Sequence, residues 1–257
     1  MAVATRIDSA LAATITQTSL VNALITAFTN AGYSAAFDNY TSGTDRVLIY
    51  RFDADASKTF GSNFLRIRVT TALVINVTIG TAFNTSTKAL SNGSTEIVFT
   101  ALSTTVNINF TALNAGSEAR LVLLTQGATF IPLGMIIPAN RPSWWNLDSW
   151  NYGFIFIASA MSVIRSSSIS PYSNSDYEIF SSTRLSAINT QTNRRDVLTG
   201  LILLTQSNAG VAGKTSDDLG IAAATGSARF DTLSFPDNTQ QFLLVNTGTS
   251  GFAVRVN

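Results

Sequence analysis

The 257-residue sequence contains no cysteine and no histidine. Without cysteine, the chain can form neither disulfides nor a thiolate metal site. Without histidine, it lacks the usual general base near neutral pH and the commonest protein metal ligand. A serine nucleophile would have no histidine partner, and neither a Walker loop nor a G-x-G-x-x-G fingerprint occurs. We therefore expect no catalytic residue, no bound metal and no cofactor.

Charge is also scarce, since only 12% of the residues are charged, about half the ~25% that is usual in soluble proteins. The formal net charge of +1 comes without a basic run, so we expect no binding to nucleic acid through its phosphates. No run reaches the ~20 apolar residues that cross a bilayer, and we expect no membrane partner. A polar surface built from Thr, Ser and Asn suits a protein that packs against neighbours.

Two apolar patterns predict helices in an N-terminal arm over residues 1–33. In the first, Ile7, Leu11 and Ile15 recur four residues apart, so they would share one face of a helix. In the second, an apolar stripe begins after Ser19 and ends before Gly32. Its members include Leu20, Leu24 and Phe28. These helices either cover the chain's own sheet or contact a neighbouring subunit, and in the second case Leu20, Leu24 and Phe28 are the expected contacts.

From residue 45 onward the apolar period changes to two, which is typical of strands. In "FLRIRV" (64–69) aliphatic residues alternate with arginines, and in "VNINFTAL" (106–113) apolar residues alternate with asparagines. Turn segments such as "SGTD" and "SNGS" separate these runs. The pattern predicts a mainly β protein with antiparallel β-sandwich-like domains and one or two N-terminal helices.

Two prolines near residue 139 suggest a boundary between a first β domain at 34–138 and a second at 139–257. The segment "LVLLTQ" (121–126) recurs as "LILLTQ" (201–206). A duplicated β domain is therefore an open alternative to two unrelated ones.

All three tryptophans lie close together in "RPSWWNLDSWN" (141–151). They are Trp144, Trp145 and Trp150, and Phe154 and Phe156 follow them. One interpretation is that these aromatic side chains pack at a domain junction or a subunit interface. The other is that exposed indoles stack on sugar rings. The rigid prolines just upstream favour packing.

A second group of candidate contacts lies in the polar stretch 166–196, which is long for a plain connection. Arg194 and Arg195 can form an ion-pair contact with a partner, or can lie on a solvated loop. Pairs of carboxylates occur in "FDADAS", "SDYEIF" and "SDDLG". Glycosidases use such pairs, but polar loops and strand ends account for all three.

Four segments together carry a resemblance: "LVNALITAFTNAGY", "YTSGTDRVLIYRF", "ASKTFGSNFLRIRV" and "IIPANRPSWW". In these segments the chain resembles a virion structural protein of a tailed bacteriophage, of the kind that infects cyanobacteria. The resemblance implies a β-rich component of the virion, present in many copies as a homo-oligomer such as a trimer or hexamer, with other virion proteins as partners.

The chain lacks the repeats or coiled stalk of a fibre and the β-helix repeats of a tailspike. We therefore expect a compact, non-enzymatic tail, baseplate or neck accessory (adaptor) protein. The alternative is a carbohydrate- or receptor-binding fibre or decoration domain that binds a host surface glycan.

Overall fold

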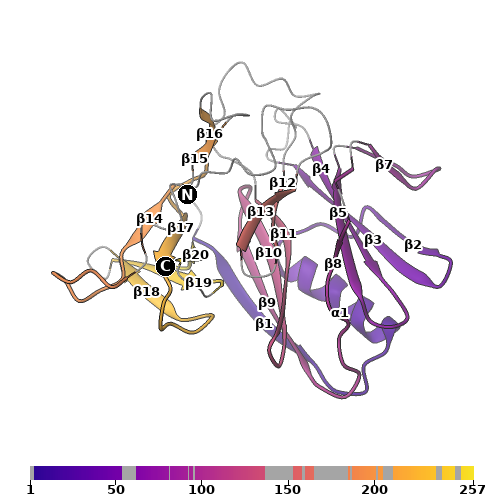
Figure 1. Cartoon of the computed structure of the whole chain (residues 1–257). Helices are drawn as coiled ribbons and strands as arrows, with labels where there is room; N and C mark the ends of the chain where they lie inside the picture. The colour runs from indigo at the N-terminus through magenta and orange to yellow at the C-terminus, as the bar shows by residue number, and fades with distance from the viewer. Residues whose placement is uncertain are drawn as a thin grey trace.

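The computed structural model describes residues 3–53, 62–80, 82–91, 93–94, 96–136, 153–157, 160–164, 185, 187–200, 202–204, 211–235, 239–246 and 250–257. Within these ranges the protein is mainly β, with a single helix and antiparallel sheets (Figure 1), so the mainly β prediction is confirmed. Among the described residues, no helix has both the length and the apolar character needed to cross a membrane.

Most strands belong to three sheets. The central sheet has the order β1 (Thr5–Leu11), β9 (Ile108–Ala115), β10 (Ala119–Gln126), β11 (Thr129–Ile136), β12 (Gly153–Ile157), β13 (Ala160–Ile164). The N-terminal sheet has the order β2 (Asp38–Ser42), β3 (Asp45–Asp53), β4 (Ser62–Val69), β5 (Ile75–Gly80), β8 (Ile97–Val98). The C-terminal sheet has the order β14 (Val197–Thr199), β17 (Leu219–Ala223), β20 (Ser250–Arg255), β19 (Gln240–Leu244), β18 (Thr232–Phe235).

Two short ribbons complete the described strands. One pairs β6 (Ala82–Asn84) with β7 (Ala89–Ser91), and the other pairs β15 (Ile202–Leu204) with β16 (Val211–Lys214). The hexapeptide at 121–126 and its near-copy at 201–206 therefore lie in different kinds of sheet. Its first copy lies in β10, inside a six-stranded sheet, whereas the second includes β15 of a two-stranded ribbon.

The segment expected to form the first helix is instead strand β1, so that prediction is wrong. β1 pairs antiparallel with β9, and Ile7 lies opposite Ala112. Residues 7 and 11 are an even number apart, so they share a face of a strand as well as a face of a helix. Tertiary contacts hold the segment in the sheet, since Asp8 accepts a hydrogen bond from the Thr111 hydroxyl of β9.

Helix α1 (Gln17–Asn30) is the second predicted helix, and it begins three residues before the expected position. Its N-cap is Thr16, whose hydroxyl accepts a hydrogen bond from the backbone N–H of Ser19 at 3.1 Å. The Ser19 hydroxyl accepts one in return from the backbone N–H of Thr16 at 2.9 Å, which completes a capping box. The apolar stripe faces the chain's own core, where Leu20, Leu24 and Phe28 are fully buried.

These three side chains are therefore core residues and not partner contacts. In Figure 1, α1 lies between the central sheet and the N-terminal sheet. One cluster of buried side chains joins α1 to β3, β4 and β5 on one side and to β9, β10 and β11 on the other. The expected helical arm is thus a strand and a helix that both belong to the body of the molecule.

The central sheet is buried on both faces, and alternate residues of β10 show this directly. Val122 and Leu124 belong to the cluster around α1. Leu121 and Leu123 belong to a second cluster, with residues of β17, β19 and β20 in the C-terminal sheet. A strand that is buried on both faces reads as a continuous apolar run, which explains "LVLL" at 121–124.

One face of the C-terminal sheet is tightly packed around two of its glycines. A side chain at Gly220 would lie 2.8 Å from Val197, and one at Gly251 would overlap the carbonyl of Asn246. Val197 of edge strand β14 and Leu233 of the opposite edge strand β18 belong to one buried cluster. The chain termini meet beside this sheet, where the Ala4 N–H donates to the Arg255 carbonyl at 3.0 Å (Figure 1). The expected domain boundary near 139 lies in 137–152, outside the described residues.

Candidate interaction surface at strand β1

The sequence-predicted aromatic cluster is only partly covered by the structure. Trp144, Trp145 and Trp150 lie outside the described residues, and for Phe154 and Phe156 the structure gives the backbone of β12 alone. Phe154 pairs with Ile136, the last residue of β11. The interpretation of these aromatic residues as packing or as a sugar platform therefore stays a prediction.

Arg194 and Arg195 follow a tight turn that Asn189 organises. The Asn189 N–H donates to the Arg194 carbonyl at 2.8 Å, and the Asn193 N–H donates to the Asn189 carbonyl at 2.8 Å. Arg195 Nη1 donates to the carbonyl of Ala223 at 2.9 Å, so Arg195 ties this turn to the C-terminal sheet. Arg194 is exposed.

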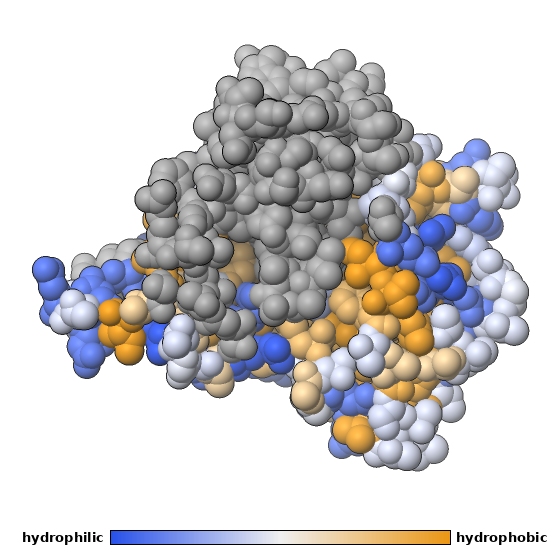
Figure 2. Space-filling model, viewed as in Figure 1, coloured by the Kyte–Doolittle hydropathy of each residue, from blue (hydrophilic) through white to orange (hydrophobic). Residues whose placement is uncertain are grey.

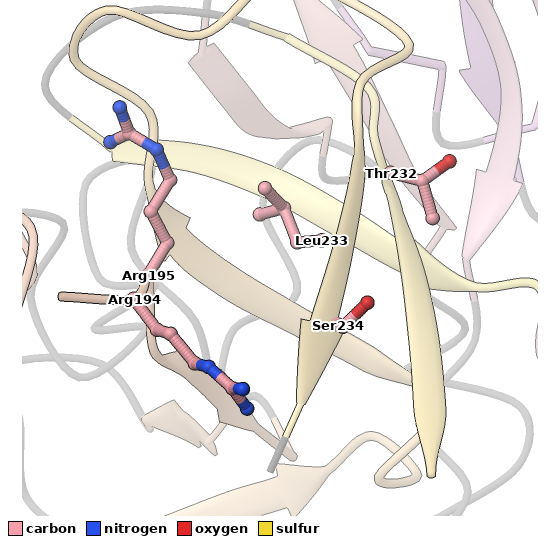
Figure 3. Close-up of a pocket in the computed structure, with 5 residues that line it drawn as sticks. All are labelled: Arg194, Arg195, Thr232, Leu233 and Ser234. Atoms are coloured by element: carbon pink, nitrogen blue, oxygen red, sulfur yellow. The ribbon is translucent and has the colours of Figure 1, made fainter. Parts of the chain in front are cut away.

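The two arginines line a cavity of about 190 Å³ with Thr232, Leu233 and Ser234 of β18. Figure 3 shows that the two guanidinium groups point in opposite directions, and that Thr232 and Ser234 point away from both. The charges and hydroxyls do not converge on one point, so the cavity lacks the geometry of an anion site. Arg194 and Arg195 remain candidate partner contacts at most.

Strand β1 presents a different kind of surface, because it is the terminal strand of the central sheet. Its first six residues are exposed and the seventh is half-buried. Among the described residues, no strand pairs with the side of β1 that faces away from β9. An unpaired edge offers a row of backbone N–H and C=O groups to another chain, and "TRIDSAL" has no proline to interrupt that row.

The side chains on one face of β1 carry opposite charges. Arg6 Nε lies 2.9 Å from Asp8 Oδ2, and the Thr111 hydroxyl donates to Asp8 Oδ1 at 2.6 Å. The Arg6 guanidinium lies over the ring of Phe230, 5.4 Å from its centroid. These contacts hold both charged groups in place before any partner arrives. On the other face, Ile7 is 43% exposed and is one of the few large apolar side chains at the described surface.

A groove of about 490 Å³ runs beside these residues, between the central sheet and Phe230. Its lining includes Asp8, Asn109, Thr111 and Thr125. The groove therefore combines a carboxylate, an amide and several hydroxyl-bearing residues with the aromatic residue Phe230. Hydroxyl-rich ligands such as sugars use such groups for hydrogen bonding and ring stacking.

Within the described residues, no cluster of three or more Asp or Glu side chains could hold a metal ion. On the face shown in Figure 2, a group of hydrophobic residues lies right of centre, with hydrophilic residues around it. Arg229, next to Phe230, lies 3.8 Å from the centroid of the Phe130 ring, and burial lowers the pKa of its guanidinium. Arg229 thus serves packing between the sheets.

The sequence reasoning missed β1 and the groove, because it assigned residues 5–15 to a helix. The available signal was the alternation of "TRIDSAL", in which Arg6 and Asp8 share one face of a strand and Ile7 takes the other. No protein-family model matches the chain, and a search of curated proteins finds no relative.

Proposed function

We propose that the protein is a non-enzymatic structural component of a phage particle, a compact tail, baseplate or neck accessory protein that assembles in many copies with other virion proteins. Residues of the N-terminal and central sheets share one buried cluster with α1, which supports a sandwich-like arrangement of the strands. Low charge and the absence of cysteine and histidine fit an assembly role better than catalysis.

The observation that carries this proposal is the exposed edge of β1. Proteins that stay monomeric usually protect such edges with very short strands, prolines, bulges or covering loops. β1 is seven residues long and pairs without a bulge along its whole length with β9. Strand addition at this edge would give a neighbour main-chain hydrogen bonds, and the side chains of β1 would then select the neighbour.

Light scattering after size-exclusion chromatography, combined with hydrogen exchange, tests the proposal. We expect an oligomer whose β1 amides become more protected as the protein concentration rises. Ile7→Lys should weaken that oligomer, because lysine on an edge strand opposes pairing. Val98→Lys is the matched control, since Val98 is 64% exposed on β8, an edge strand of another sheet. A chain that stays monomeric at all concentrations, alone and with virion proteins, would contradict an assembly role.

The second candidate function is carbohydrate or receptor binding, and the groove beside β1 favours it. Asn109, which is exposed, and the aromatic residue Phe230 both line this groove. A glycan array followed by calorimetry tests this function. Binding of a host surface glycan that Asn109→Ala and Phe230→Ala abolish would support it, whereas binding that survives both changes would exclude this groove.

A further inference from the structure

We infer that the partner of the β1 edge is a second copy of the same strand, paired antiparallel about a two-fold axis that passes through Ile7. This inference rests on the proposed assembly function and names the neighbour and the register. In this register Ile7 faces the partner's Ile7, Arg6 faces the partner's Asp8, and Thr5 faces the partner's Ser9. The two central sheets would become one continuous sheet across the axis.

The charges on β1 are complementary to themselves in this register. Within one chain Arg6 already contacts Asp8 at 2.9 Å, and the pairing would place each of these groups directly opposite its counter-charge in the other chain. Four charges of alternating sign then form a closed square. Opposite charges directly across an antiparallel pair are stabilising and like charges are destabilising. A network of this kind contributes more than an isolated surface ion pair.

Neighbouring two-fold registers lose this complementarity. If the axis passed through Asp8, the two Asp8 carboxylates would face each other and Arg6 would face the partner's Ala10. If it passed through Arg6, the two guanidinium groups would face each other. Each alternative places like charges directly opposite at the centre of the pair, so the charge pattern selects the register centred on Ile7.

The backbone is compatible with the same register. Alternate residues of an edge strand direct their N–H and C=O groups outward, while the others bond to the inner neighbour. The register pairs odd-numbered residues with odd and even with even. Outward-directed groups of β1 therefore meet outward-directed groups of the partner, whichever set faces outward.

The side chains on both faces of β1 favour this contact. Asp8 is fixed by the Thr111 hydroxyl at 2.6 Å and Arg6 by the Phe230 ring at 5.4 Å, so little side-chain freedom is lost on pairing. On the opposite face the 43% exposed Ile7 side chain would be covered by its own symmetry mate. Apolar pairs directly across two strands stabilise a sheet.

Single cysteines test the register, because the chain has no thiol of its own. Ile7→Cys should form a disulfide-linked dimer under mild oxidation, since residues directly opposite in an antiparallel pair have Cα atoms about 4.5 or 5.5 Å apart, within disulfide range. Ser9→Cys is the matched control. Its two thiols would be offset by four residues, about 13 Å along the strands, and should not link. A mixture of Thr5→Cys and Ser9→Cys should give the mixed dimer.

Charge-reversing substitutions test the same pairing without a disulfide cross-link. Arg6→Asp and Asp8→Arg should each weaken self-association at least tenfold, because each places like charges opposite. An equimolar mixture of these two variants should associate again, since every cross-strand pair then has opposite signs. The double variant Arg6→Asp/Asp8→Arg should associate as the natural protein does. Melting temperatures of the monomers show that the fold is retained.

The results separate the inference from the proposed function on which it rests. Oligomers that form while Ile7→Cys gives no linked dimer and the charge variants associate normally would overturn the self-pairing of β1 and leave an assembly role intact. A monomer that gains β1 protection only with other virion proteins would also overturn self-pairing. A monomer under every condition would overturn both.

Discussion

Tyr33 and Tyr50 lie beside each other in the core beneath α1, with ring centroids 5.5 Å apart in an edge-on arrangement. Burial raises the pKa of both phenols, so both are neutral at any ordinary pH. Their hydroxyls differ, however. The Tyr33 hydroxyl donates to the Arg120 carbonyl at 2.9 Å, whereas the Tyr50 hydroxyl is buried with no hydrogen-bond partner among the described residues.

This difference predicts opposite responses to the same change. Tyr33→Phe should lower the free energy of unfolding by about 1 kcal/mol, because it removes a made hydrogen bond. Tyr50→Phe should leave stability unchanged or raise it, because it removes an unsatisfied buried hydroxyl. Urea unfolding of the two variants measures both effects. Equal losses would show that the Tyr50 hydroxyl has a partner in solution.

Glu118 sits in the turn between β9 and β10, next to the C-terminal sheet. Burial raises the pKa of its carboxyl group, the hydrogen bond from Ser216 opposes this shift, and the nearby Asp218 carboxylate adds to it. A raised folded-state pKa means that the folded protein holds the proton more tightly than the unfolded chain. The associated stability is present below the unfolded pKa and is lost as the pH rises through the folded pKa.

Glu118→Gln removes this titration. The variant should therefore gain stability relative to the natural protein as the pH rises from about 4 to about 7, with the smallest advantage at the acid end. Paired melting curves across this range provide the measurement. A constant difference between the two proteins would mean that Glu118 has the same pKa folded and unfolded.

At the scale of single elements, α1 shows how local chemistry fixes a helix start. The stripe of apolar residues was predictable, but Thr16 caps the helix instead of Ser19, which forms the other half of the box. Both residues are good caps in sequence. Their roles were decided by where the chain leaves the central sheet, since the Thr14 and Ile15 N–H groups bond to the Thr104 carbonyl.

Removal of the Thr16 cap should have a measurable effect on the stability of the protein. Thr16→Ala should lower the free energy of unfolding by about 1 kcal/mol. Thr26→Ala is the matched control, since Thr26 is exposed inside the helix and its hydroxyl bonds only to the Asn22 carbonyl at 3.2 Å. That change should be neutral or slightly stabilising, because alanine favours the helix interior. If both changes cost the same, the capping box contributes nothing.

At the scale of the whole molecule, the central sheet couples the two cores. Leu124 of β10 packs toward α1 and Leu123 packs toward the C-terminal sheet, and both are almost completely buried. Because adjacent residues of one strand serve different cores, neither core can open without disturbing the sheet they share.

We therefore expect one cooperative unfolding transition. Leu123→Ala and Leu124→Ala should each lower the free energy of unfolding by about 2–5 kcal/mol and shift that same transition. Differential scanning calorimetry provides the measurement. Two separate transitions, with each variant shifting only one of them, would show that the cores are independent.

The sequence by itself determined the mainly β class, the apolar face of α1 and strands such as β4 and β9, because period-two and helical spacing reflect burial directly. Because the sequence has no histidine and no cysteine, it also excludes any reaction or metal site that needs those side chains. The tertiary structure decided the fate of residues 5–11, since Ile7 and Leu11 suit a helix or a strand equally well. Pairing with β9 selected the strand, and that choice placed Arg6, Ile7 and Asp8 on an exposed edge. The packing of sheet faces and the pairing of strand edges depend on contacts between residues distant in sequence, such as Asp8 with Thr111. The local spacing of apolar residues does not encode such contacts.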